Sequence, residues 1–134
     1  MKWHIDSDRP VYRQLIEQTE QAIISGLFSP GEKLPSVREL ASEAGVNPNT
    51  MQKALSELER SGMLHSERTS GRFITDDEDL ISNMKYQRAE YEAKSFLDSM
   101  HKLGLSVEEI KRLLTVLEKE RDEKDNEKST GNEQ

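Results

Sequence analysis

Apolar residues recur at helical spacing in three stretches of the first half of the chain. They lie within residues 10–25, 36–45 and 47–62, and glycine or proline marks the ends of these stretches. Apolar positions that repeat every three or four residues line one face of an α-helix. The pattern therefore predicts three amphipathic helices before residue 63.

Helix start signals place the second and third of these helices close together. Ser36 and Glu39 form an S-x-x-E capping box, in which the hydroxyl accepts a hydrogen bond from the N–H three residues later. Asn47 and Pro48 are a typical N-cap residue and a first-turn proline. Gly45 ends the second helix, so a single residue separates it from the next start signal. Two helices joined by such a short turn indicate a helix-turn-helix.

After residue 62 the spacing of the apolar residues changes. The short apolar pairs at 63–64 and 73–74 flank a polar stretch, and Ser70-Gly71 supplies turn chemistry within it. This arrangement predicts a β-hairpin. Three helices followed by a hairpin make a winged helix-turn-helix, which we assign to residues 1–75.

The remaining residues predict a second, helical part. Residues 76–79 read Asp-Asp-Glu-Asp and are expected to form an acidic hinge. Residues 80–119 then carry two helices broken at Gly104, the second with a capping box at Ser106 and Glu109. Residues 120–134 are polar and charged, and we expect them to be disordered. The predicted fold class is mostly α with a small β-hairpin: an N-terminal winged helix-turn-helix followed by a two-helix C-terminal dimerisation unit.

These two C-terminal helices carry more apolar surface than they can bury against each other. We expect a second copy of the chain to cover it, because a four-helix arrangement would bury the surface that a monomer exposes. The expected interface residues are Leu80, Met84, Ala93, Phe96, Leu97, Met100, Leu103, Ile110, Leu113, Leu114 and Leu117. In the alternative, the two helices pack back on their own winged head and the chain is monomeric.

The net charge of −7 lies mainly in the C-terminal part. Residues 1–75 hold 9 basic and 10 acidic side chains, whereas residues 76–134 hold 10 and 16. Local surface charge, more than whole-chain charge, decides whether a face attracts phosphate. The acidity of the chain therefore does not exclude nucleic acid as a partner.

The sequence contains few of the residues and motifs that are typical of catalytic sites. It has no cysteine, and its three histidines are far apart in sequence. Nucleotide-binding glycine motifs and the G-x-S-x-G motif of hydrolases are absent as well. We therefore expect no enzyme activity, no metal and no cofactor. The start of the chain lacks the apolar core of a secretion signal, and no apolar run is long enough to span a membrane, so we expect a cytoplasmic protein without membrane insertion.

The outward face of the third helix carries the candidate chemistry. Asn49, Gln52, Lys53 and Ser56 lie opposite its apolar positions. Asn and Gln pair with adenine in the major groove, Lys donates to guanine or phosphate, and Ser both donates and accepts. An ordinary solvated helix face would look similar.

Three arginines flank this face and favour DNA over that alternative. Arg38 lies in the first turn of the second helix, where it opposes the helix dipole and is no obvious stabiliser. Arg68 and Arg72 lie in the hairpin, within reach of a DNA backbone or minor groove. Another class of function stays open, because a winged helix can also dock a protein. Salt-dependent binding to a duplex would distinguish the two.

Three runs of sequence carry a resemblance to a known family. They are Pro-Val-Tyr-Arg-Gln-Leu at 10–15, Gly-Leu-Phe-Ser-Pro-Gly-Glu-Lys-Leu-Pro-Ser-Val-Arg-Glu-Leu-Ala at 26–41 and Gly-Val-Asn-Pro-Asn-Thr-Met at 45–51. They resemble the signature of GntR-family regulators, over about residues 8–75. The short C-terminal part is similar to that of the YtrA subfamily.

The resemblance implies operator DNA as the partner and a repressor as the function. It places DNA contacts at Arg38, Asn47, Pro48, Asn49, Thr50, Gln52, Lys53 and Gly71. Family wings often carry a second glycine where this chain has Thr69, and some relatives have arginine at the position of Pro48. The resemblance also implies transporter genes as frequent targets. We expect a homodimer on a palindromic operator with half-sites about 10 bp apart, and a small-molecule effector, if there is one, of unknown identity.

Overall fold

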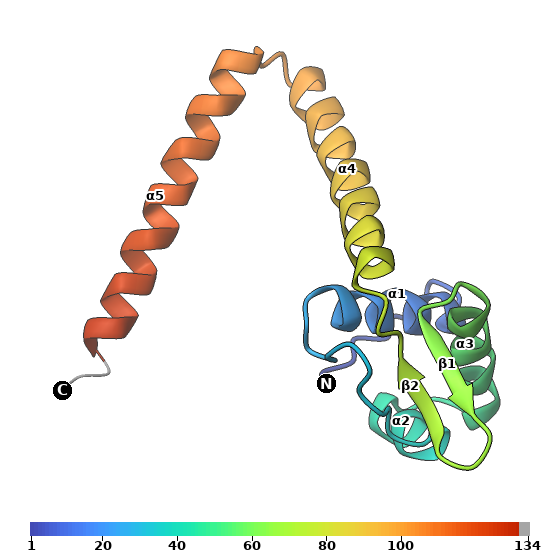
Figure 1. Cartoon of the computed structure of the whole chain (residues 1–134). Helices are drawn as coiled ribbons and strands as arrows, with labels where there is room; N and C mark the ends of the chain where they lie inside the picture. Colours follow the sequence, from blue (N-terminus) through green and yellow to red (C-terminus); the bar gives the residue numbers. More distant parts are fainter. Residues whose placement is uncertain (132–134) are drawn as a thin grey trace. The chain divides into compact units, whose positions relative to one another are not determined.

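The computed structural model describes residues 1–131, which form two compact units. The first unit is Met1–Arg88, and the second begins at Ala89. Figure 1 shows the elements of the first unit gathered into a head, namely α1 (Val11–Ile24), α2 (Val37–Ala44), α3 (Pro48–Arg60), β1 (Leu64–Glu67) and β2 (Gly71–Ile74). The predicted winged helix-turn-helix is thus confirmed.

The helix starts lie where the capping signals predicted them. Ser36 Oγ accepts from the Glu39 N–H at 3.1 Å, and Asn47 Oδ1 accepts from the Asn49 N–H at 2.8 Å. Gly45 ends α2 with a φ of 71°, in the left-handed region that glycine adopts without strain. The turn between α2 and α3 is therefore fixed at both ends by local chemistry.

A single apolar core holds the head together. Helix α1 packs on α3, α2 packs on α3, and the hairpin closes the remaining side. The buried residues of this core are Leu15, Ile23, Leu34, Leu40, Ala41, Met51, Ala54, Leu55, Leu58, Met63, Leu64 and Ile74. Because α3 turns four of these inward, its opposite face is left to solvent.

A third extended segment pairs with the hairpin, which the sequence pattern did not predict. Strands β1 and β2 are antiparallel, with Leu64 opposite Ile74. On the other edge of β2, Lys33 forms a bridge with Phe73. The Leu34 N–H donates to the Arg72 carbonyl at 2.9 Å. The segment before α2 thereby supports the wing by pairing with the outer edge of β2.

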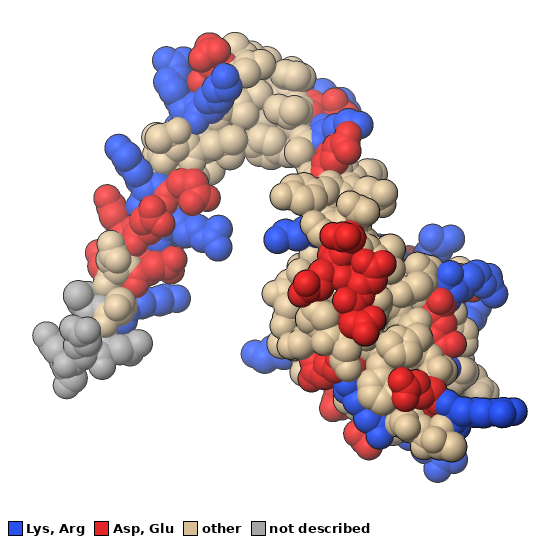
Figure 2. Space-filling model, in the orientation of Figure 1, with Lys and Arg blue, Asp and Glu red and all other residues tan. Residues whose placement is uncertain are grey.

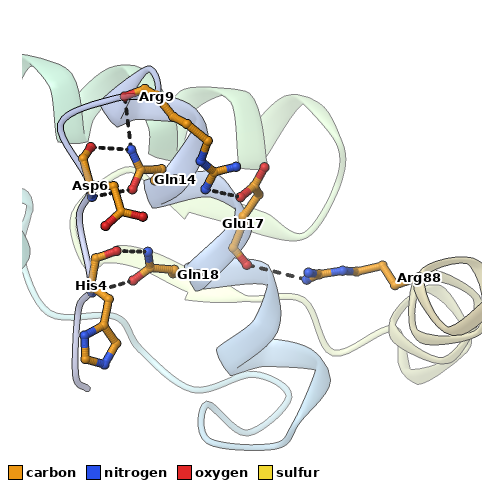
Figure 3. A network of polar contacts seen from close by, with 7 residues as sticks. All are labelled: His4, Asp6, Arg9, Gln14, Glu17, Gln18 and Arg88. Atoms are coloured by element: carbon orange, nitrogen blue, oxygen red, sulfur yellow. Dashed lines mark hydrogen bonds and ion pairs between the residues drawn. The ribbon is translucent and has the colours of Figure 1, made fainter. Parts of the chain in front are cut away.

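The N-terminal segment is tied to α1 by two glutamine side chains (Figure 3). The buried Gln14 amide accepts from the Asp6 N–H at 2.7 Å and donates to the carbonyls of Asp6 and Arg9 at 2.8 and 3.0 Å. Gln18 accepts from and donates to the His4 backbone in the same way, at 3.0 and 2.7 Å. These side chains satisfy backbone groups that would otherwise lack a protein partner.

Residues 78 and 79 of the acidic segment at 76–79, which was expected to form a hinge, lie in the first turn of a helix. Helix α4 (Glu78–Lys102) begins within this segment. Asp77 Oδ1 accepts from the N–H groups of Asp79 and Leu80, both at 3.1 Å. Acidic side chains in a first helical turn also interact favourably with the helix dipole.

The first turns of α4 belong to the head. Leu80, Ile81 and Met84 pack against its core. Arg88 Nη1 donates to the Glu17 carbonyl at 3.5 Å, as Figure 3 also shows. Leu80 and Met84 were expected at the dimer interface, and the structure shows that the head core covers part of both side chains. Helical spacing identifies an apolar face, but it does not tell whether the chain's own core or another molecule covers that face.

Helix α5 (Val107–Gly131) starts in the second unit where the sequence predicted a helix. It extends past residue 119, where the helical part was predicted to end. In its capping box the Ser106 N–H donates to Glu109 Oε1 and the Glu109 N–H donates to Ser106 Oγ, both at 3.2 Å. The expected disorder was wrong for residues 120–131, which are helical, while 132–134 lie outside the described residues. Glu, Lys and Arg dominate this stretch, and they combine high helix propensity with favourable pairs one turn apart.

Most of the remaining residues that we expect at a dimer interface are exposed in the second unit. Ile110 is buried, and Phe96 and Met100 are half-buried. The exposed ones are Ala93, Leu97, Leu103, Leu113, Leu114 and Leu117. Among the described helices, none combines the length and apolar character needed to cross a membrane.

Candidate nucleic-acid interface

The outer face of α3 presents the polar residues that the sequence singled out. Asn49, Gln52, Lys53 and Ser56 are exposed, and Thr50 is half-buried. The first residue of the helix, Pro48, is exposed as well. The side chain of Asn47 caps the helix. The face therefore combines amide, ammonium and hydroxyl groups on one rigid element.

Lys53 lies over an aromatic ring of the neighbouring helix. Its Nζ is 4.0 Å from the centroid of the Tyr12 ring on α1, and Arg13 Cζ lies 5.9 Å from the same centroid. An ammonium over a ring face is attracted by the ring's quadrupole. Tyr12 thus limits where Lys53 can reach, a contact between distant residues that sequence spacing could not reveal.

The side chain of Gln52 takes part in a chain of hydrogen bonds across α3. Its Nε2 donates to Ser56 Oγ at 3.3 Å, one turn further along the helix. Its Oε1 accepts from Arg72 Nη1 of the wing at 3.4 Å. The sequence predicted separate DNA contacts for Gln52, Ser56 and Arg72. The structure shows that hydrogen bonds join these three side chains.

Arg72 points toward α3, which changes its expected role. Its Nε donates to Glu59 Oε1 in an ion pair, and its side chain is only 18% exposed. Ser66 Oγ of β1 donates to the same carboxylate oxygen. Burial alone would raise the pKa of Glu59, but the hydrogen bonds from Ser66 and Arg72 and the positive charge of Arg72 lower it. Arg72 therefore joins the wing to α3 through this ion pair.

The free basic groups near the wing are Arg68 and Lys33. Arg68 is exposed in the hairpin turn and, within residues 1–131, forms no ion pair. Lys33 is exposed beside the wing and was missed by sequence reasoning. A side chain at Gly71 would start only 3.3 Å from Lys33 Cε, and the φ of Gly71 is 112°. Glycine is thus favoured there by conformation alone, because the exposed Lys33 side chain could move aside.

A groove separates the wing from the start of α2. Its volume is about 590 Å³, and residues 33–37 and Glu39 line one side while Ser66, Glu67 and residues 70–72 line the other. Arg38, next to these residues, is exposed and lacks an ion-pair partner in the described part of the chain. Its guanidinium is free to meet a phosphate.

Charge is distributed unevenly over the head. Figure 2 shows acidic side chains gathered where α4 begins, at residues 76–79. Basic side chains project from the end of the head that carries the hairpin turn. Acidic side chains also lie beside the basic ones at that end, so the basic groups there are spaced among acidic ones.

Comparison with known families and proteins identifies this head. The family model of the bacterial regulatory proteins of the gntR family matches residues 11–74. The chain is 36% identical to the HTH-type transcriptional regulator YhcF of Bacillus subtilis over 104 residues, which cover 78% of this chain and 86% of that protein. It is 35% identical to the HTH-type transcriptional repressor YtrA of Bacillus subtilis over 105 residues, 78% and 81% of the two chains.

Solved structures extend the similarity beyond the head. A GntR family transcriptional regulator from Listeria monocytogenes superposes with a TM-score of 0.78 at 33% identity, covering 83% of this chain and 97% of that one. A transcriptional regulator from Oenococcus oeni gives a TM-score of 0.72 at 31% identity, covering 85% and 95%. This chain belongs to the GntR family of bacterial transcription regulators, and its winged helix-turn-helix is the family's DNA-binding domain.

Proposed function

We propose that this chain represses transcription as a homodimer bound to a palindromic operator. Its similarity to a protein named as a transcriptional repressor, over most of both chains, supports repression. The exposed leucines of α4 and α5 support self-association, because water-exposed apolar surface is stabilised by burial in a partner. A two-fold dimer matches the symmetry of a palindromic site.

In the proposed complex, α3 lies in the major groove. Gln52 and Asn49 read base edges, Lys53 donates to guanine or phosphate, and Ser56 donates or accepts beside them. The positive end of the α3 dipole, near Pro48 and Thr50, favours a phosphate. The observation that carries this proposal is the exposed polar face of α3, rigidly backed by the core.

Two sets of groups outside α3 would hold the backbone of the duplex. Arg38 at the start of α2 anchors a phosphate on one side. Arg68 and Lys33, both exposed, reach the backbone or minor groove beside the wing. Phosphate contacts set orientation and register, while base contacts set specificity.

Single alanine substitutions on α3 test this assignment. Gln52→Ala should weaken operator binding by about 1–3 kcal/mol and blur sequence preference, because a bidentate base contact is lost. Lys53→Ala should weaken binding to all sequences alike and lower the salt slope by about one if its partner is phosphate. Affinities for operator and scrambled duplexes, measured at several salt concentrations, separate the two effects.

Lys85→Ala is the matched control, since it removes the same charge from an exposed position on α4. It should leave both affinities close to those of the unmodified chain. Unchanged affinity and salt slope in both α3 variants would mean that this face does not meet DNA.

A further inference from the structure

The hydrogen bonds around Glu59 have a consequence for sequence recognition. Glu59 lies on the last turn of α3, and its carboxylate accepts from Ser66 of β1 and from Arg72 of β2. Its side chain is 29% exposed. One carboxylate of α3 thus contacts both strands of the wing; burial raises the pKa of Glu59, but these hydrogen bonds and the charge of Arg72 lower it overall.

Arg72 pairs with Glu59 through Nε, and another nitrogen of the same guanidinium, Nη1, faces the side-chain amide of Gln52. A guanidinium has only donors, so the atom that it meets must be the amide oxygen. The observed contact joins Arg72 Nη1 to Gln52 Oε1 at 3.4 Å. A flipped amide would place its NH₂ against the guanidinium and lose this hydrogen bond. At the other end, Nε2 donates to Ser56 Oγ at 3.3 Å; a hydroxyl both donates and accepts, so the contact with Arg72 is the one that sets the orientation.

We propose that Glu59 and Arg72 act as positioning residues that fix the amide of Gln52 in one orientation for reading a base. The inference rests on the proposed operator binding by α3. An amide oxygen has two lone pairs and an amide nitrogen has two hydrogens. The amide oxygen uses one lone pair to accept from Arg72, and the amide nitrogen uses one hydrogen to donate to Ser56. The second lone pair and the second hydrogen remain available to a base.

A fixed amide selects a base edge by the order of its donor and acceptor. Adenine offers N6–H₂ as a donor beside N7 as an acceptor, and Gln pairs with both. With Oε1 held on the Arg72 side and Nε2 on the Ser56 side, only one order of base donor and acceptor matches. A freely rotating amide would accept either order. The wing thereby contributes to base selection through Gln52 without touching that base.

The test compares base preference at the single position that depends on Gln52. Duplexes selected from a random library by the intact chain, and by Gln52→Ala, define that position as the one where preference is lost. Arg72→Met removes all donors but keeps an apolar stem of similar length, and Glu59→Gln removes the charge that holds Arg72. Both variants are expected to lower the preference at that position by about tenfold. Thermal unfolding confirms that each variant is folded.

Two further variants separate positioning from a structural role. Glu57→Gln removes a neighbouring carboxylate on α3, which forms an ion pair with the exposed Arg60, and should leave the preference unchanged. In a Gln52→Ala background, Arg72→Met should have no further effect on the preference at that position, because the two act as one unit.

If Arg72→Met weakens binding equally for all bases at that position, Arg72 only supports the wing and the inference is overturned. If the intact chain selects no sequence, the proposed function itself fails. If it selects a sequence but Gln52→Ala removes no preference, operator binding stands and the positioning role falls.

Discussion

A chain ending at Arg88 is expected to be monomeric and to bind a two-half-site operator about 10²–10⁴-fold more weakly than the intact chain. Linking two binding modules makes the second contact intramolecular, which accounts for a gain of this size. Residue 88 is the proper end point because Leu80, Ile81 and Met84 pack against the head core, and a shorter fragment would expose that core. Sedimentation and operator titration measure the two effects.

A pair of substitutions tests the same interface in the intact chain. Leu113→Glu with Leu117→Glu places charges on the exposed apolar side of α5 and should also give monomers. Thr115→Glu with Lys119→Glu adds the same two side chains on the opposite side of α5 and should leave the dimer intact. A monomeric unmodified chain at micromolar concentration would overturn the proposed dimer.

The second large effect concerns stability. Leu15→Ala should lower the free energy of unfolding by about 2–5 kcal/mol, because Leu15 is fully buried between α1 and the rest of the core and truncation leaves a cavity. Since small domains are stable by only about 5–15 kcal/mol, this is a large fraction of the total. Urea unfolding at a fixed chain concentration gives the value.

Leu27 supplies the matched control, because it is the same residue type but 60% exposed. Leu27→Ala should change the free energy of unfolding by no more than about 0.5 kcal/mol. Equal losses in the two variants would contradict the core described for the head.

Local signals account for what the sequence could predict. Ser36 and Asn47 cap the helices that they were expected to cap, because a capping hydrogen bond involves residues only two or three apart. The positions of Gln52 and Lys53 followed from the same reasoning, since the periodicity of α3 determines which side chains face away from the core.

Contacts between distant residues account for what it could not. The ion pair between Glu59 and Arg72, and the contact of Lys53 with Tyr12, depend on how elements pack. The same holds for Leu80 and Met84, which periodicity placed on an apolar face without identifying what covers it. The helix through residues 120–131 was missed for another reason: a highly charged composition is shared by disordered segments and by exposed helices.

Sequence-specific binding of DNA is the central claim, and one titration tests it most directly. The intact chain is titrated onto a duplex selected from a random library and onto a scrambled duplex of the same composition, at increasing salt. The account predicts binding at least about 10³-fold tighter to the selected duplex and a steep loss of affinity for both with salt. Equal affinity for the two duplexes, or no binding to either at low salt, would contradict it and favour a winged helix that docks a protein.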